Sequence, residues 1–144
     1  MPSFRQAALR HATHFGLMLT EASKLYAQGH EFVQHGLVAF DNEWGNIQTG
    51  QAWAAAHSLE SRTIAQLARD YPDRGADLLD LRLHARERIS WLESAIRASK
   101  LLNDQGMEML HSGNLGQAYA DLYEIDRAID LYEQTLLLAS AWHR

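Results

Sequence analysis

The sequence predicts an all-α protein, for three reasons. Its 144 residues include 21 alanines and 21 leucines but only 2 valines and 6 isoleucines, and β-branched residues are the ones enriched in strands. Its only prolines are Pro2 and Pro72, so two long stretches lack the residue that most often interrupts a helix. Apolar residues also recur at steps of three and four, the spacing of one buried helical face. A chain of this length is typical of a single domain.

Two long helices are expected first, over residues 4–28 and 31–57. In the first, Ala12, Phe15 and Leu19 belong to one apolar face, and the break falls at Gly29. Three glycines weaken the second helix, each by about 1 kcal/mol relative to alanine, so a bend there is expected. They are Gly36, Gly45 and Gly50.

Five further helices follow from the same periodicity. The third begins at Ser61 and is expected to end at Tyr71, because a residue that precedes proline avoids helical backbone angles. A short helix then begins at Asp73 or Gly75. The last three are predicted over residues 86–102, 105–122 and 125–142. The connections are two to five residues long, which is typical of antiparallel neighbouring helices.

An internal repeat suggests how the helices stack. Residues 91–96 align with residues 131–136 at an offset of forty positions. A period of this length is typical of stacked helical hairpins, that is, of an α-solenoid. We therefore expect one helical domain over residues 1–144. It divides into a long hairpin (4–57), a degenerate repeat (60–103) and a better-matching repeat (105–142).

The last repeat carries a recognisable pattern. The run Gly113-Asn114-Leu115-Gly116-Gln117-Ala118-Tyr119, followed by Ala128 and Tyr132, resembles the tetratricopeptide repeat. In this reading Gly116 and Ala128 allow two helices to approach closely, and Tyr132 fills the space beside them. The resemblance implies a right-handed α–α superhelix. Tyr123 departs from the family pattern, which usually has glycine there, so this turn must avoid a left-handed backbone or carry strain.

Two more segments resemble a larger setting of that repeat. Residues 41–47 and 82–93 are similar to the helical region that leads into tetratricopeptide repeats in bacterial signal-transduction ATPases of the NB-ARC kind. That resemblance implies a sensor or scaffold arm beside a nucleotide switch. This chain contains no such switch: Gly45–Ala52 has two glycines at the spacing of a phosphate loop, but Gln51 and Ala52 replace the required lysine and hydroxyl residue.

Composition and charge disfavour several classes of function. The chain has no cysteine, which removes thiol catalysis and thiolate metal sites. Its net charge of −5 disfavours nucleic-acid binding. No apolar run approaches a membrane span and no signal peptide is evident, so no membrane partner and a cytoplasmic location are expected. Since no catalytic constellation stands out, we expect a protein that is not an enzyme and needs no cofactor.

The function that the sequence favours is non-catalytic binding of peptide or protein partners on a concave helical surface. Three polar residues share one face of the sixth helix, Asn114, Gln117 and Asp121, and amides there could bind a peptide backbone. The resemblance assigns that role to Asn114. The alternative is a helical small-molecule or metal site at His11 and His14, which lie three residues apart and would need a third ligand.

A homodimer is a further expectation. If no capping helix follows the last repeat, the seventh helix leaves an apolar edge for a second chain or for a further repeat. The residues expected on that edge are Leu136, Leu137, Leu138 and Trp142.

Overall fold

The computed structural model describes residues 3–142, and within them every element of regular secondary structure is a helix. The all-α prediction is therefore confirmed for this part of the chain. The helices are α1 (Phe4–Gln28), α2 (Glu31–His57), α3 (Arg62–Arg74), α4 (Ala76–Arg82), α5 (Ala85–Leu101), α6 (Gln105–Asp121) and α7 (Ile125–Trp142).

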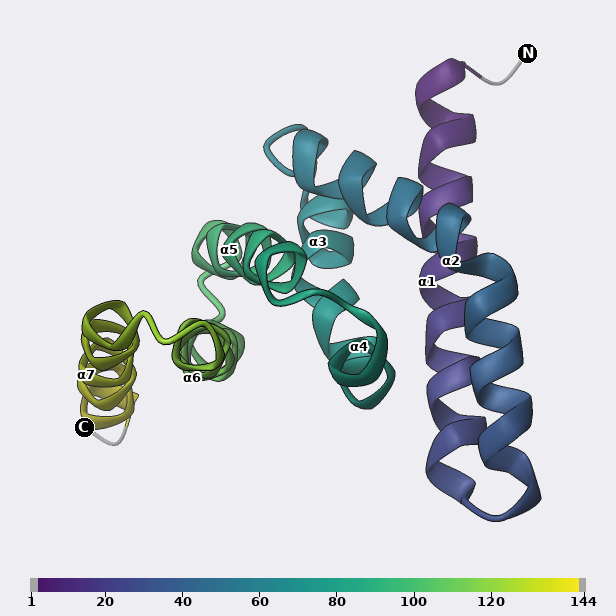
Figure 1. Ribbon diagram of the computed structural model, residues 1–144. Helices are drawn as coiled ribbons and strands as arrows, with labels where there is room; N and C mark the ends of the chain where they lie inside the picture. The colour runs from purple at the N-terminus through teal and green to yellow at the C-terminus, as the bar shows by residue number, and fades with distance from the viewer. Residues whose placement is uncertain (1–2, 143–144) are drawn as a thin grey trace.

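The helices form an elongated array in chain order (Figure 1). The hairpin of α1 and α2 stands at one end and α7 at the other, with α3 to α6 between them. The main contacts are those of α1 with α2, α3 with α5, α5 with α6, and α6 with α7. Helix α5 therefore packs on α3 and α6, α6 packs on α5 and α7, and α7 packs on α6.

The α1–α2 hairpin depends on close backbone approach. A Cβ atom on Gly36 would lie 2.7 Å from the carbonyl oxygen of Ala22 and from the amide nitrogen of Tyr26, both in α1. At Gly50 a Cβ would meet the Tyr71 hydroxyl and lie 3.2 Å from the Cα of Ala12. The expected bend is present: Figure 1 shows α2 changing direction along its length while remaining one helix.

The prediction that α3 ends at Tyr71 is wrong. The helix continues through Pro72 to Arg74, and the next helix begins at Ala76. Proline near a helix end removes one backbone hydrogen bond, and packing outweighs that loss here. Tyr71 is fully buried and its hydroxyl donates a hydrogen bond of 2.5 Å to the carbonyl oxygen of Ala12. Burial raises the pKa of Tyr71, which keeps the hydroxyl a donor.

Helix α5 is the centre of the array because it is buried on several faces. Trp91 belongs to a core cluster with α1, α2, α3 and α4. Ala98 packs with α1, α2 and α3, whereas Leu92 packs with α6 and α7. A helix that is apolar on most sides is typical of the interior, and α5 joins the two ends of the array.

The turns after α5 and α6 have the same backbone geometry. At the first, the amide of Asp104 donates to the carbonyl of Ser99; at the second, the amide of Glu124 donates to that of Tyr119. In both turns the residue directly before the donating amide has a left-handed backbone: φ is 54° at Asn103 and 60° at Tyr123. Asparagine tolerates this conformation, but tyrosine is strained by it. Of the two outcomes expected for Tyr123, the structure shows the strained one.

No helix within residues 3–142 combines the length and the apolar character needed to cross a bilayer. Exposed ion pairs connect some of the helices. Arg82 of α4, for example, forms a two-bond ion pair with Asp41 of α2, at 3.0 and 3.1 Å.

The close approach of α1 and α2 yields a first prediction. Gly36→Ala should lower the free energy of unfolding by about 1–3 kcal/mol, because the added methyl group meets backbone atoms that cannot move aside cheaply. Gly45→Ala is the matched control in the same helix. Gly45 is exposed and nothing lies near its Cβ position, so alanine should raise stability by about 1 kcal/mol through helix propensity alone. Urea denaturation of both variants measures this, and a Gly36→Ala variant as stable as Gly45→Ala would contradict it.

Candidate interaction surfaces

The three polar residues predicted on α6 do share a face. Gln117 and Asp121 are exposed and Asn114 is half-buried. The Gln117 amide is already engaged within the chain: its nitrogen donates to Asp121 at 2.9 Å, and its oxygen accepts from the Tyr132 hydroxyl at 3.4 Å. No side-chain hydrogen bond to Asn114 occurs within residues 3–142. Of the two amide side chains, that of Asn114 is therefore the more available to a partner.

An apolar stripe runs along α7 beside this face. Its residues are spaced by four, three and four positions, which places them on one side of a helix. All four are exposed, with Ile129 47% and Leu136 68% accessible. We call Ile125, Ile129, Tyr132 and Leu136 the α7 stripe. The hydrogen bond from Tyr132 to Gln117 joins the stripe to the polar face of α6, so the two form one continuous surface.

The stripe is bordered by negative charge. Asp126, Asp130 and Glu133 are exposed on α7, and no ion pair within residues 3–142 engages them. The one cation among these residues of α7, Arg127, has its guanidinium carbon 5.4 Å from the centre of the Tyr119 ring. It is thus placed toward α6. The border of the stripe is consequently acidic.

Packing between α6 and α7 holds this surface in place. A Cβ on Gly116 would lie 2.8 Å from Cε1 of Tyr132, so only glycine allows the ring to lie so close to α6. Leu115, Tyr119 and Ala128 are buried in the cluster beneath. These are the packing roles that the sequence predicted for Gly116, Ala128 and Tyr132.

Tyr119 also connects α6 to α5. Its hydroxyl donates a hydrogen bond of 3.1 Å to Glu93. Burial raises the pKa of Tyr119, and the bond to Glu93 raises it further. The hydroxyl therefore stays protonated and able to donate at neutral pH.

The predicted apolar edge is divided between two places. Leu136 belongs to the α7 stripe. Leu137 and Leu138 instead line a shallow hollow of about 260 Å³ together with Glu108 and Gln134. The side chain of Trp142 lies outside the part of the chain that the structure describes. Leu136 and Leu137 are both exposed and Leu138 is half-buried; their use as one self-association edge stays a prediction.

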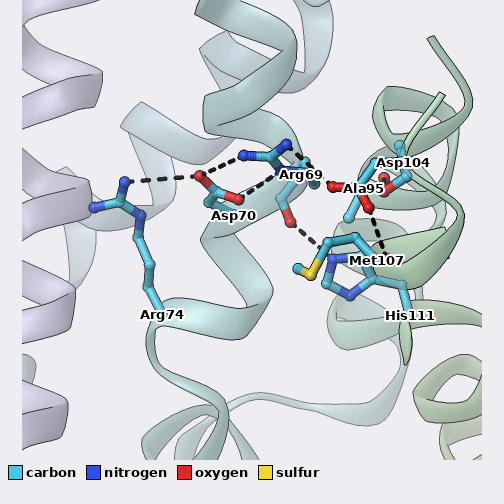
Figure 2. Close-up of polar contacts among 8 residues, drawn as sticks. Arg69, Asp70, Arg74, Ala95, Asp104, Met107 and His111 are labelled. Carbon is cyan, nitrogen blue, oxygen red and sulfur yellow. Dashed lines mark hydrogen bonds and ion pairs between the residues drawn. The ribbon is translucent and has the colours of Figure 1, made fainter. Parts of the chain in front are cut away.

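A polar junction fixes the start of α6 against α3 (Figure 2). The Arg69 guanidinium donates to Asp70 at 2.7 and 3.3 Å and to Asp104 at 3.2 Å. Asp104 caps α6, since its other oxygen accepts from the amide of Met107 at 3.1 Å. The hydrogen bond to Asp70 is the main cause that raises the pKa of Arg69, so the guanidinium is always charged.

His111 completes the junction from inside α6. Its side chain is buried (1% accessible), and its Nε2 lies 2.8 Å from the carbonyl oxygen of Arg69. Because a carbonyl only accepts, Nε2 carries the proton. The Nδ1 atom is enclosed and has no hydrogen-bond partner among residues 3–142. Burial, the largest effect, lowers the pKa of His111, while the Arg69 carbonyl and the carboxylates of Asp73, Asp70 and Asp104 act in the opposite sense.

The histidines of the alternative hypothesis do not meet a third ligand. Nε2 of His11 lies 3.4 Å from Oδ1 of Asn46, and the rings of His11 and His14 both pack on Phe15. Within the described residues, no three histidine or acidic side chains lie close enough together to hold a metal ion. The geometry therefore gives His11 and His14 a packing role.

Sequence reasoning missed the junction. Arg69 and Asp104 are 35 positions apart, and Arg69 and His111 are 42 apart, so neither pair shares a helix. One signal was available: Asp104 stands directly before a predicted helix, where aspartate is favoured as an N-cap. Nothing in the sequence indicated that His111 would be buried rather than exposed.

The environment of His111 predicts how stability depends on pH. Its pKa is lower in the folded chain than in the unfolded chain, where it is near 6.5. As the pH falls below about 6.5, the unfolded chain takes up a proton that folded His111 does not, so the free energy of unfolding falls, by at most about 1.4 kcal/mol per pH unit. The loss stops where folded His111 itself protonates. His111→Gln should make the dependence shallower in urea denaturation between pH 7 and about pH 5; equal slopes would contradict this account.

We compared the chain with protein-family models, with curated proteins and with solved structures. None of the three comparisons found a match. The tetratricopeptide resemblance therefore stays a prediction, and the function has to be argued from the surfaces themselves.

Proposed function

We propose that this chain is a non-catalytic interaction module that binds an amphipathic helix of a partner protein across the α7 stripe. The observation that supports this most directly is the stripe itself. It presents exposed apolar side chains at helical spacing beside the face of α7 that packs on α6, and one of them, Tyr132, lies against Gly116 of α6. Contiguous exposed apolar surface of this kind is typical of sites where proteins bind each other.

The shape of the stripe favours a helix as the partner element. It extends over three helical turns, about 16 Å from Ile125 to Leu136. Within the chain, each of α5 and α6 packs on the helix that follows it. A partner helix on α7 would continue the same mode of packing, in which apolar residues three and four positions apart interdigitate.

The negative charge around the stripe favours a partner helix with basic residues. Asp126 and Glu133 lie on α7 beside the stripe, and Asp121 lies beyond it on α6. A partner helix that carries lysine or arginine on both sides of its apolar face would satisfy these carboxylates. The same acidic border disfavours the homodimer expected from the sequence, because two α7 helices packed face to face would bring like charges together.

The polar face of α6 adds the second half of the proposed surface. The amide of Asn114 has no side-chain hydrogen bond within residues 3–142 and could bind the backbone or a polar side chain of the partner, while Gln117 is held by Asp121 and Tyr132. This retains the peptide-binding role that the tetratricopeptide resemblance implies for Asn114 and moves the main contact area to α7. A solenoid-like superhelix that curves around the partner is part of the same proposal.

A binding experiment with a synthetic peptide tests the proposal. The probe is a fluorescein-labelled amphipathic helix with leucines on one face and lysines on the other, titrated with the protein and followed by anisotropy. Ile129→Glu should weaken binding by at least about tenfold, since it places a charge in the centre of the buried contact. Val38→Glu is the matched control: Val38 is also 47% exposed, but it lies on α2, away from α7.

The outcomes separate the candidate partners. Equal effects of Ile129→Glu and Val38→Glu on binding would show that the peptide does not bind at the α7 stripe and would contradict the proposal. A dimer in sedimentation equilibrium that Ile129→Glu dissociates would assign the stripe to a second copy of this chain instead of a basic helix. Circular dichroism of both variants confirms that they are folded before binding is measured.

A further inference from the structure

A second surface, remote from α7 in the fold, combines apolar residues with positive charge. It lies where the turn after α2, the start of α3 and the end of α5 meet. Two adjoining hollows, of about 440 and 220 Å³, share Ser58, Leu59 and Leu101 in their walls. Leu59 stands 84% exposed in the turn and Leu101 is also exposed. We call the two hollows together the α3–α5 groove.

Three cations line this groove. Arg97 and Lys100 of α5 lie in the larger hollow and Arg62 of α3 in the smaller one. None of the three forms an ion pair within residues 3–142, and the one side-chain hydrogen bond that Arg97 makes there goes to the hydroxyl of Ser94. A chain whose net charge is −5 thus concentrates unneutralised cations around an apolar floor.

Two carboxylates in the turns beside the groove, those of Glu60 and Asp104, are already paired within the chain. Glu60 accepts from His57 at 2.8 Å and lies 3.7 Å from Arg5. Asp104, in the turn after α5, is bound by Arg69 at 3.2 Å. The groove cations are therefore left to an external anion.

Arg62 is poorly placed for the stability of its own helix. It is the first residue of α3, whose first turn contains no acidic residue. A cation at a helix N-terminus is opposed by the positive end of the helix dipole, and Ser61 already provides the cap. An anionic group bound in the groove would interact favourably both with Arg62 and with this helix end.

From these observations we propose that the α3–α5 groove binds an acidic segment of a partner protein, with an apolar side chain of that segment placed between Leu59 and Leu101. The carboxylates of the segment pair with Arg62, Arg97 and Lys100. Apolar contact supplies the anchor and the cations supply specificity and rapid association. This site is independent of the α7 stripe and has the opposite charge, so the chain would join two partners of different chemistry.

The test uses a short fluorescein-labelled peptide of alternating glutamate and leucine, followed by anisotropy. Arg62→Glu and Lys100→Glu should each weaken binding by at least about tenfold, and the affinity of the wild-type protein should fall as salt is added. Lys24→Glu is the matched control, because it changes the net charge equally on an exposed part of α1. Leu59→Ser tests the apolar contact without changing charge and should also weaken binding.

Three results would overturn the proposal. They are an absence of saturable binding, equal weakening by Lys24→Glu and Lys100→Glu, and a Leu59→Ser variant that binds as well as the wild type. The last result would mean that the peptide is attracted by charge alone and makes no apolar contact with Leu59. Sedimentation of the protein alone tests whether a second copy of the chain occupies the groove. If the protein self-associates and Arg62→Glu dissociates it, the groove binds the acidic α7 of that second copy. Since each substituted side chain is exposed, the thermal midpoint of every variant should stay near that of the wild type.

Discussion

Arg69 joins α3 to α6 through both its side chain and its backbone. Its guanidinium binds the aspartate that caps α6, and its backbone carbonyl accepts a hydrogen bond from the imidazole buried in α6. The core beneath α6 and α7 is separate from the two clusters that surround α1, α2 and α3. Only α5 contributes to all three. The junction at Arg69 is thus a second connection between the two parts, and it ties the start of α6 directly to α3.

Local sequence signals were sufficient to predict the helices, but not the way they pack. The bounds of α1, α2 and α7 follow from periodicity and from the breaks between apolar faces. The predicted end of α3 at Tyr71 was wrong because the burial of Tyr71 outweighs the tendency of a residue before proline to leave the helix. Gly36 was expected to weaken α2, and the structure shows that it permits close contact with α1. Such contacts depend on residues far apart in the chain.

The candidate surfaces were predictable to different degrees. Asn114, Gln117 and Asp121 share a face because their spacing is helical, but the sequence did not show that Gln117 would be engaged by Tyr132. The predicted leucine edge included Leu136 and omitted Ile125 and Ile129, whose exposure depends on how far α6 covers α7. The α3–α5 groove was missed altogether. Its residues come from a turn and two helices, and no single stretch of sequence contains them.

The two proposed sites are similar in construction and opposite in charge. Each offers exposed apolar side chains next to charges that the chain leaves unneutralised within residues 3–142. The α7 stripe is acidic at its border, and the α3–α5 groove is basic. They are joined through α5, α6 and the Arg69 junction, so the distance and orientation between two bound partners would be set by the helices between them. This is the behaviour expected of a scaffold.

The most direct test of this account is a double-mutant cycle between Arg69 and Asp104. Arg69→Met keeps the apolar stem and Asp104→Ser keeps a helix cap, so each variant removes mainly the interaction between α3 and α6. Both side chains are less than one third exposed, and urea denaturation should give a coupling free energy of about 1–2 kcal/mol. A coupling indistinguishable from zero would mean that this ion pair does not help to hold α6 against α3, and would contradict the account.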